Sequence, residues 1–175
     1  MISGFLPEGE IHSRAGGSAA PYEMGHDPGR YPLARIVAAA EMASHGGRPS
    51  FSDPDAAVRY WAAQGYLIRG EVDDALRAAA KDSSPCVRAV AAEALGRYGN
   101  EQDLQIAVAA LMPMADVRNS GVFVALAAVT ALDAIGRKAA AALGDLARLP
   151  REAVGVDVRY QSYLRRLIEK AISNL

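Results

Sequence analysis

The chain has 175 residues, which is long enough for one well-buried domain and too short for two independent ones. Its formal net charge of -1 and its pI near 6.3 leave no global excess of positive charge, so neither nucleic acid nor an anionic membrane surface is expected as a partner. A single cysteine, Cys86, cannot close an intramolecular disulfide, so packing must hold the fold.

Residues 1–31 are predicted to form an irregular arm. They contain six glycines and three prolines, and their apolar residues follow neither the strand period nor the helix period. Burial of bulky apolar residues such as Phe5, Leu6 and Ile11 would still be favourable in free energy. We therefore expect the arm to lie on its own domain or on a second molecule, where it could form a homodimer. The first residues lack the features of a secretory signal, so the chain by itself is expected to be cytoplasmic.

Residues 32–175 are predicted to be helices and turns, because apolar residues recur at helical spacing and glycine or proline stands at most boundaries. Asp53 is expected to cap the second helix, with Pro54 in its first position, and Pro113 is expected to interrupt the fifth. The first helix is expected to bury Leu33, Ile36, Val37 and Ala40. The expected helices are 32–44, 54–69, 72–79, 85–98, 101–112, 120–135, 138–149 and 157–173.

One stretch of sequence is repeated. DPDAAVRYWAAQGYLIRG (53–70) returns 29 residues later in residues 82–99, which begin with Asp82 and continue from Cys86 as CVRAVAAEALGRYG. A third copy begins VALAAVTALDAIG (124–136). In each copy the apolar residues share one helical face, and a shorter amphipathic helix lies beside it. A helical hairpin cannot bury such a face alone, but stacked hairpins bury it against one another. In the second copy this face is Val87, Val90, Ala91, Ala94, Leu95 and Tyr98.

The pattern DPxxxVRxxAAxAL in these helical pairs resembles HEAT-type repeats. Two copies carry its arginine, as Arg59 and Arg88, whereas Ala125 replaces it in the third. The resemblance implies an all-α fold, an α-α superhelix. We expect a HEAT-like solenoid of helical hairpins over residues 32–175, preceded by the irregular arm of residues 1–31.

Four segments in order carry a second resemblance. GFLPEGEIHSRAGG (4–17), PYEMGHDPGRYPLARIVAAAEMAS (21–44), the first repeat copy and VALAAVTALDAIG look like the C-terminal region that follows the catalytic domain in bacterial sulfatases of the sulfoglucosamine-sulfohydrolase type. This implies a helical tail whose partner is the missing catalytic domain, with a periplasmic location if the parent is exported. The residues after Cys86 do not match the sulfatase nucleophile signature, so no catalytic residue is carried over.

Arg59, Tyr60 and Arg88 are the candidate binding surface. Each arginine follows an aspartate of the preceding turn by six residues. Two interpretations stay open: a structural ladder between repeats, or a row of anion contacts for a sulfated sugar or a protein carboxylate. Tyr60 is expected to be more exposed than Trp61 and Tyr66, which occupy positions of the apolar face.

No other chemistry is predicted. The three histidines lack the spacing of a helical zinc site, and Gly16 and Gly17 do not fit a phosphate-binding fingerprint. We expect no catalytic, cofactor or metal site, and hence no enzyme in this chain alone. The favoured function is a noncatalytic module for protein packing or ligand binding, as part of a sulfatase-like protein. The alternatives are a free-standing scaffold for protein–protein interaction and an enzyme with a HEAT-like fold.

Overall fold

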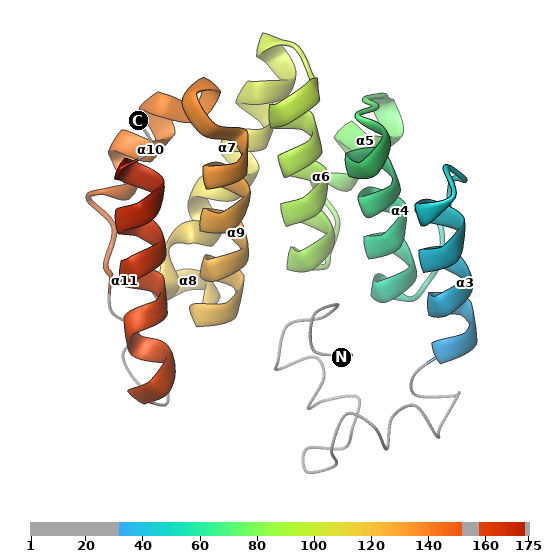
Figure 1. Ribbon diagram of the computed structural model, residues 1–175, viewed down its shortest axis with the longest axis horizontal. Helices are drawn as coiled ribbons and strands as arrows, with labels where there is room; N and C mark the ends of the chain where they lie inside the picture. The colour runs from blue at the N-terminus through green and yellow to red at the C-terminus, as the bar shows by residue number, and fades with distance from the viewer. Residues whose placement is uncertain (1–31, 152–157, 174–175) are drawn as a thin grey trace.

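The computed structural model describes residues 32–151 and 158–173, in which every regular element is a helix. The helices form two layers (Figure 1). Within the first layer, helices that follow one another along the chain pack side by side. This layer consists of α3 (Leu33–Ser44), α4 (Ala56–Arg69), α6 (Pro85–Tyr98), α9 (Val122–Ile135) and α11 (Val158–Ser173).

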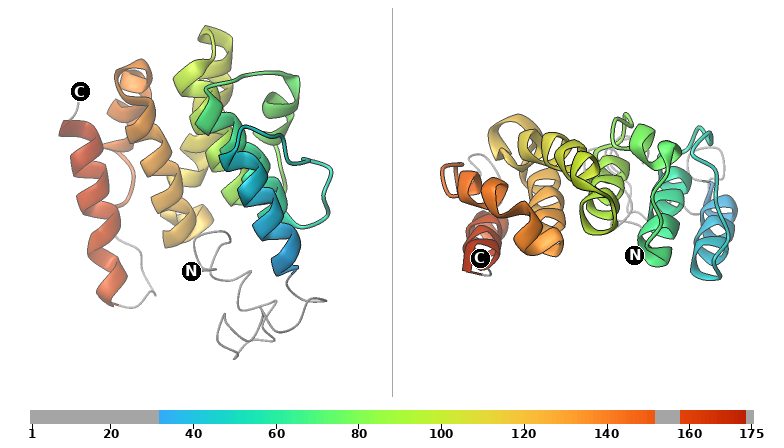
Figure 2. Two further views of the ribbon diagram at one scale, coloured as in Figure 1. Left: turned by 45° about the vertical axis from the view of Figure 1, so that its right-hand side comes forward. Right: turned by 90° about the horizontal axis from the view of Figure 1, so that it is seen from above.

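The second layer lies behind the first and connects its helices, as the view from above shows (Figure 2). From α4 to α9, each first-layer helix forms a hairpin with the second-layer element that follows it. The stacked hairpins make the α-α superhelix that the sequence predicted. The second layer consists of α5 (Asp74–Ala79), α7 (Glu101–Ala115), α8 (Val117–Ser120), the 3-10 helix η2 (Gly136–Ala139) and α10 (Ala140–Leu146).

The start of α4 differs from the prediction. Asp55 is the N-cap, and its carboxylate accepts a hydrogen bond from the N–H of Ala57 at 2.8 Å. Asp53 lies before the helix, so the prediction that it caps α4 with Pro54 in the first position is wrong. Asp55 takes this role because its side chain reaches the free N–H groups of the first turn directly. In the second copy Pro85 does occupy the first position of α6.

The repeated apolar face packs the first-layer helices together. Val87, Ala91 and Leu95 of α6 have 0% exposure, and Val90 keeps only 8%. Tyr98 was predicted on the same face, but it is 41% exposed. Its ring lies against the turn at Gly70, after the end of α4, instead of between two helices. The face is therefore buried along α6 except in its last turn.

α3 stands at the end of the row, with α4 as its first-layer neighbour. It buries Ile36, Ala39 and Ala43, while Leu33 and Val37 are 39% and 45% exposed. The predicted apolar face of this helix was therefore rotated away from the true one. Among the described helices α3 packs mainly against α4, and a helix with one such neighbour needs only a narrow apolar strip, which small residues can supply.

Pro113 does not interrupt its helix. It is exposed in the last turn of α7, which continues to Ala115. A one-turn helix that the sequence did not predict, α8, follows at once and is capped by Asp116. Because α8 takes up these residues, α9 begins at Val122, later than predicted.

The C-terminal end of the superhelix is closed by α10 and α11. The predicted helix 138–149 is divided between η2 and α10. Leu164, Ile168 and Ala171 of α11 have 0% exposure. The irregular arm predicted for residues 1–31, and the homodimer contact proposed for it, lie outside the described residues.

Small residues set the distance between α6 and α9. A Cβ atom at Gly96 would lie 2.7 Å from Cγ1 of Ile135 and closer still to its Cδ1. Gly96→Ala should therefore lower the free energy of unfolding by about 1–3 kcal/mol, the usual cost of overpacking. Urea unfolding of the single variants and of Gly96→Ala with Ile135→Ala measures this. The double variant should lose less stability than the sum of the single losses. Strict additivity would show that the two side chains do not compete for space.

Candidate functional site

The turns that precede α4 and α6 share one hydrogen-bond pattern. Asp53 Oδ1 accepts from the N–H of Asp55 at 2.8 Å, and Asp82 Oδ1 accepts from the N–H of Ser84 at 2.7 Å. An aspartate that bonds the backbone two residues ahead fixes a tight turn. The repeat seen in the sequence is thus also a repeat of turn geometry.

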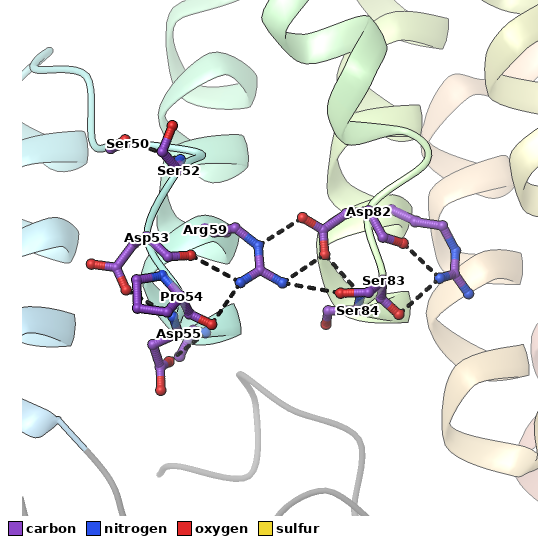
Figure 3. A network of polar contacts seen from close by, with 11 residues as sticks. Ser50, Ser52, Asp53, Pro54, Asp55, Arg59, Asp82, Ser83 and Ser84 are labelled. Carbon is purple, nitrogen blue, oxygen red and sulfur yellow. Dashed lines mark hydrogen bonds and ion pairs between the residues drawn. The ribbon is translucent and has the colours of Figure 1, made fainter. Parts of the chain in front are cut away.

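Arg59 joins its own turn to the next one (Figure 3). Nη1 donates to the carbonyl oxygens of Asp53 and Pro54 at 3.0 and 2.9 Å. On the other edge of the guanidinium, Nε and Nη2 donate to the two carboxylate oxygens of Asp82 at 2.7 and 2.9 Å. A two-point contact of this kind fixes orientation as well as distance, so it holds the turn before α6 against α4.

The pair is shielded from solvent, since each of the two side chains is only 12% exposed. Burial by itself raises the pKa of Asp82. The hydrogen bonds from Arg59 and from the N–H of Ser84 outweigh this effect and hold the pKa of the carboxyl below its ordinary value. These contacts are those of a structural ladder between repeats.

Arg88 repeats part of this arrangement in the next hairpin. Its Nη1 donates to the carbonyl oxygens of Asp82 and Ser83 at 2.8 and 3.1 Å. These two carbonyls are the equivalents of the Asp53 and Pro54 carbonyls that Arg59 bonds. The Nη1 atoms of the two arginines are therefore bound in equivalent ways to the turn before their own helix.

Tyr60 is half-buried, whereas Tyr66 is buried, and Tyr60 lines a groove across three first-layer helices. The Gln64 amide donates to its hydroxyl at 2.7 Å, and burial raises the pKa of Tyr60 above its ordinary value. We call this hollow the α4–α6–α9 groove; its volume is about 290 Å³. It is lined by Tyr60, Gln64, Cys86, Ala89, Val90, Glu93, Ala127, Thr130 and Ala131.

The groove carries one polar residue from each helix at the same repeat position. Gln64, Glu93 and Thr130 are each the sixth residue after the valine that starts the apolar face of its copy. Glu93 is the carboxylate of this row. Its side chain is 16% exposed, and burial raises its pKa, although a 3.0 Å hydrogen bond from Arg97 opposes the shift.

The three predicted residues do not form one surface. Tyr60 lines the groove, whereas Arg59 and Arg88 are bound to the turns and do not line it. Gln64, Glu93 and Thr130 were not predicted from the sequence. Their common position in the three copies is the signal that could have found them.

Within the described ranges, no cluster of histidine, cysteine and acidic side chains could hold a metal ion. His45 is hydrogen-bonded through Nδ1 to the carbonyl oxygen of Glu41. His12 and His26 lie outside the described residues. None of the described helices has the length and apolarity needed to cross a bilayer.

The Arg59–Asp82 pair can be tested against Arg88 as a matched control. Arg59→Gln should cost about 2–3 kcal/mol of unfolding free energy, because it leaves a buried carboxylate without its charged donor. Arg88→Gln loses the same two carbonyl contacts and no carboxylate partner, so its loss should be smaller. Urea denaturation at neutral pH compares the two. Equal losses would mean that the carbonyl contacts alone stabilise the turn.

The same pair predicts a dependence on pH. The pKa of Asp82 is lowered in the folded chain, so its stabilisation is complete above the unfolded value of about 3.9 and disappears as the pH falls through the lower folded value. Asp82→Asn should therefore lose less stability than the wild type when the pH falls from about 5 to 2. Urea denaturation across this pH range measures the difference, and parallel losses in the two proteins would contradict the prediction.

Comparison with known proteins identifies the repeat region. Residues 49–122 match the model of the family described as HEAT repeats. No curated protein and no solved structure matches the chain. The match covers α4 to α8, which includes the turns of Asp53 and Asp82 and both ladder arginines. This part of the chain is a HEAT-like helical repeat region.

Proposed function

We propose that the chain is a noncatalytic helical-repeat module that binds a segment of another protein in the α4–α6–α9 groove. The observation that carries this proposal is the row of Gln64, Glu93 and Thr130, one polar side chain from each of three stacked helices. Packed helices stand about 8–10 Å apart and an extended chain advances about 3.3–3.6 Å per residue, so a row with the repeat of the stack can bond about every third residue of an extended segment. HEAT repeats are consistent with such a scaffold.

The size and lining of the groove favour side chains of a polypeptide over a separate small molecule. Its volume of about 290 Å³ is at the lower limit of small-molecule pockets, which span about 300–1,000 Å³. Ala89, Val90, Ala127 and Ala131 supply an apolar surface, and the polar row supplies hydrogen bonds. The carboxylate of Glu93 favours a segment with a basic side chain at this point, because a cation would offset the cost of its burial.

A finer proposal is that the module is the C-terminal part of a sulfatase-like protein and packs on the catalytic domain. Its support is the order of four segments in the sequence. A free-standing scaffold for other proteins is the alternative. An enzyme with a HEAT-like fold is the second alternative.

The groove proposal is tested with displayed random peptides selected on the purified chain. Enriched peptides should carry lysine or arginine. They should lose at least about tenfold in affinity for Thr130→Trp, which places a large side chain at the exposed edge of the groove, and also for Glu93→Gln. Fluorescence anisotropy of labelled peptides gives the affinities.

Gln102→Trp is the control, because Gln102 is exposed on α7 in the other layer and does not line the groove. Peptides that bind the wild type and Thr130→Trp equally would show that the groove is not the binding site. Peptides without basic residues that still depend on Thr130 would support the groove and reject the role of Glu93.

The noncatalytic assignment predicts that the chain hydrolyses no sulfate ester. The residues that follow Cys86 are Val87 and Arg88, which do not form the sulfatase nucleophile. Release of the phenol from an aryl sulfate in the presence of calcium is the measurement. Turnover that follows the purified chain and survives Cys86→Ala would reveal a site that the sequence does not predict.

A further inference from the structure

The ladder of arginines and turn aspartates stops after two contacts. Arg35 Nη1 of α3 lies 3.6 Å from Asp53 Oδ2, in the turn before α4. Arg59 of α4 holds Asp82, in the turn before α6. In both cases an arginine of one first-layer helix meets a carboxylate from the turn that precedes the next first-layer helix.

Arg88 of α6 is anchored as Arg59 is, but it has no carboxylate partner among the described residues. For Arg59, the anchored Nη1 leaves the Nε and Nη2 edge directed at the next turn, where Asp82 accepts from both atoms. The two Nη1 contacts of Arg88 match the two Nη1 contacts of Arg59 to within 0.2 Å. The first is 2.8 Å in Arg88 and 3.0 Å in Arg59, and the second is 3.1 Å in Arg88 and 2.9 Å in Arg59. Arg88 therefore has the same Nη1 anchor as Arg59, whereas its Nε and Nη2 atoms have no acceptor among the described residues.

The turn before α9 explains the missing partner. In the third copy Asn119 stands where the first two copies have Asp53 and Asp82, and it is exposed within α8. The nearest acidic residue in this turn, Asp116, is already bonded by the guanidinium and the backbone N–H of Arg118. The turn before α9 therefore lacks the carboxylate that would pair with Arg88, although Arg88 itself is present and anchored.

The unused edge of Arg88 is accessible. Arg88 is half-buried. None of its side-chain nitrogens is both fully buried and without a hydrogen-bond partner. A guanidinium edge of two parallel N–H groups matches the two oxygens of a carboxylate. The contact between Arg59 and Asp82 is an example of that match within this chain.

We propose that Arg88 is a docking site for a carboxylate of a partner protein, which takes the place that Asp82 has beside Arg59. The ligand is an aspartate or glutamate side chain, because carboxylates occupy both preceding positions of the ladder. This site is separate from the α4–α6–α9 groove, whose lining does not include Arg88. It does not depend on the groove proposal.

Sodium acetate is the probe, and the Nε–H signals of the arginine side chains are followed by NMR of the 15N-labelled chain. The Arg88→Lys variant assigns the Arg88 signal by its disappearance. Acetate should shift this signal along a saturating curve, relative to sodium chloride at equal ionic strength. Arg59, which is already paired, should shift several-fold less, and the exposed Arg137 should show only a linear drift. A response of Arg88 that follows Arg137 would overturn the proposal.

A second readout separates this site from general salt effects. Acetate should raise the melting temperature of the wild type above that in chloride, and the difference should disappear in Arg88→Lys, which keeps the charge but not the two-point geometry. Thr130→Trp, which blocks the groove, should keep the full acetate effect, so failure of the groove proposal leaves this one intact. An acetate effect that persists in Arg88→Lys, or a saturating shift of Arg88 with sulfate but not with acetate, would reject carboxylate docking.

Discussion

The ion pair between Arg59 and Asp82 is the contact on which the arrangement of the first-layer helices α4 and α6 depends. It ties two turns together, and each turn starts a first-layer helix, so the pair sets how α4 and α6 are placed. A two-point ion pair with little exposure has a narrow range of allowed geometries. The apolar faces can then meet in one register, and positions that are equivalent in sequence become neighbours in space.

Small side chains also allow a short distance between neighbouring first-layer helices. Alanines fill most of the seam between the first-layer helices, and Gly96 leaves room for Ile135. A seam of this kind gives each residue little apolar area, so its stability comes from contact over the whole length of the helices. Equivalent positions on the outer side of the helices also come near one another. This is why Gln64, Glu93 and Thr130 share one groove.

The two proposed sites arise from the repeat in opposite ways. The groove exists because all three copies keep a polar residue at the same position. The open edge of Arg88 exists because the third copy departs from the first two, with Asn119 in place of an aspartate and Ala125 in place of an arginine. A repeat protein can thus use both the regular and the irregular positions of its stack. The two sites also differ in charge, since the groove presents the carboxylate of Glu93 and the other site presents the guanidinium of Arg88.

The sequence by itself determined the all-helical class, the stacked hairpins and the buried face of Val87, Ala91 and Leu95. These follow from local periodicity and from a repeat that matches at turn and helix alike. Tertiary structure decided which residues of the end helix α3 are buried, because a local pattern does not show which side of this helix packs against α4. It also decided that Arg59 is engaged at both edges while Arg88 is not. That difference depends on the turn of the following hairpin, which α8 reshapes, and so on contacts between segments distant in the chain.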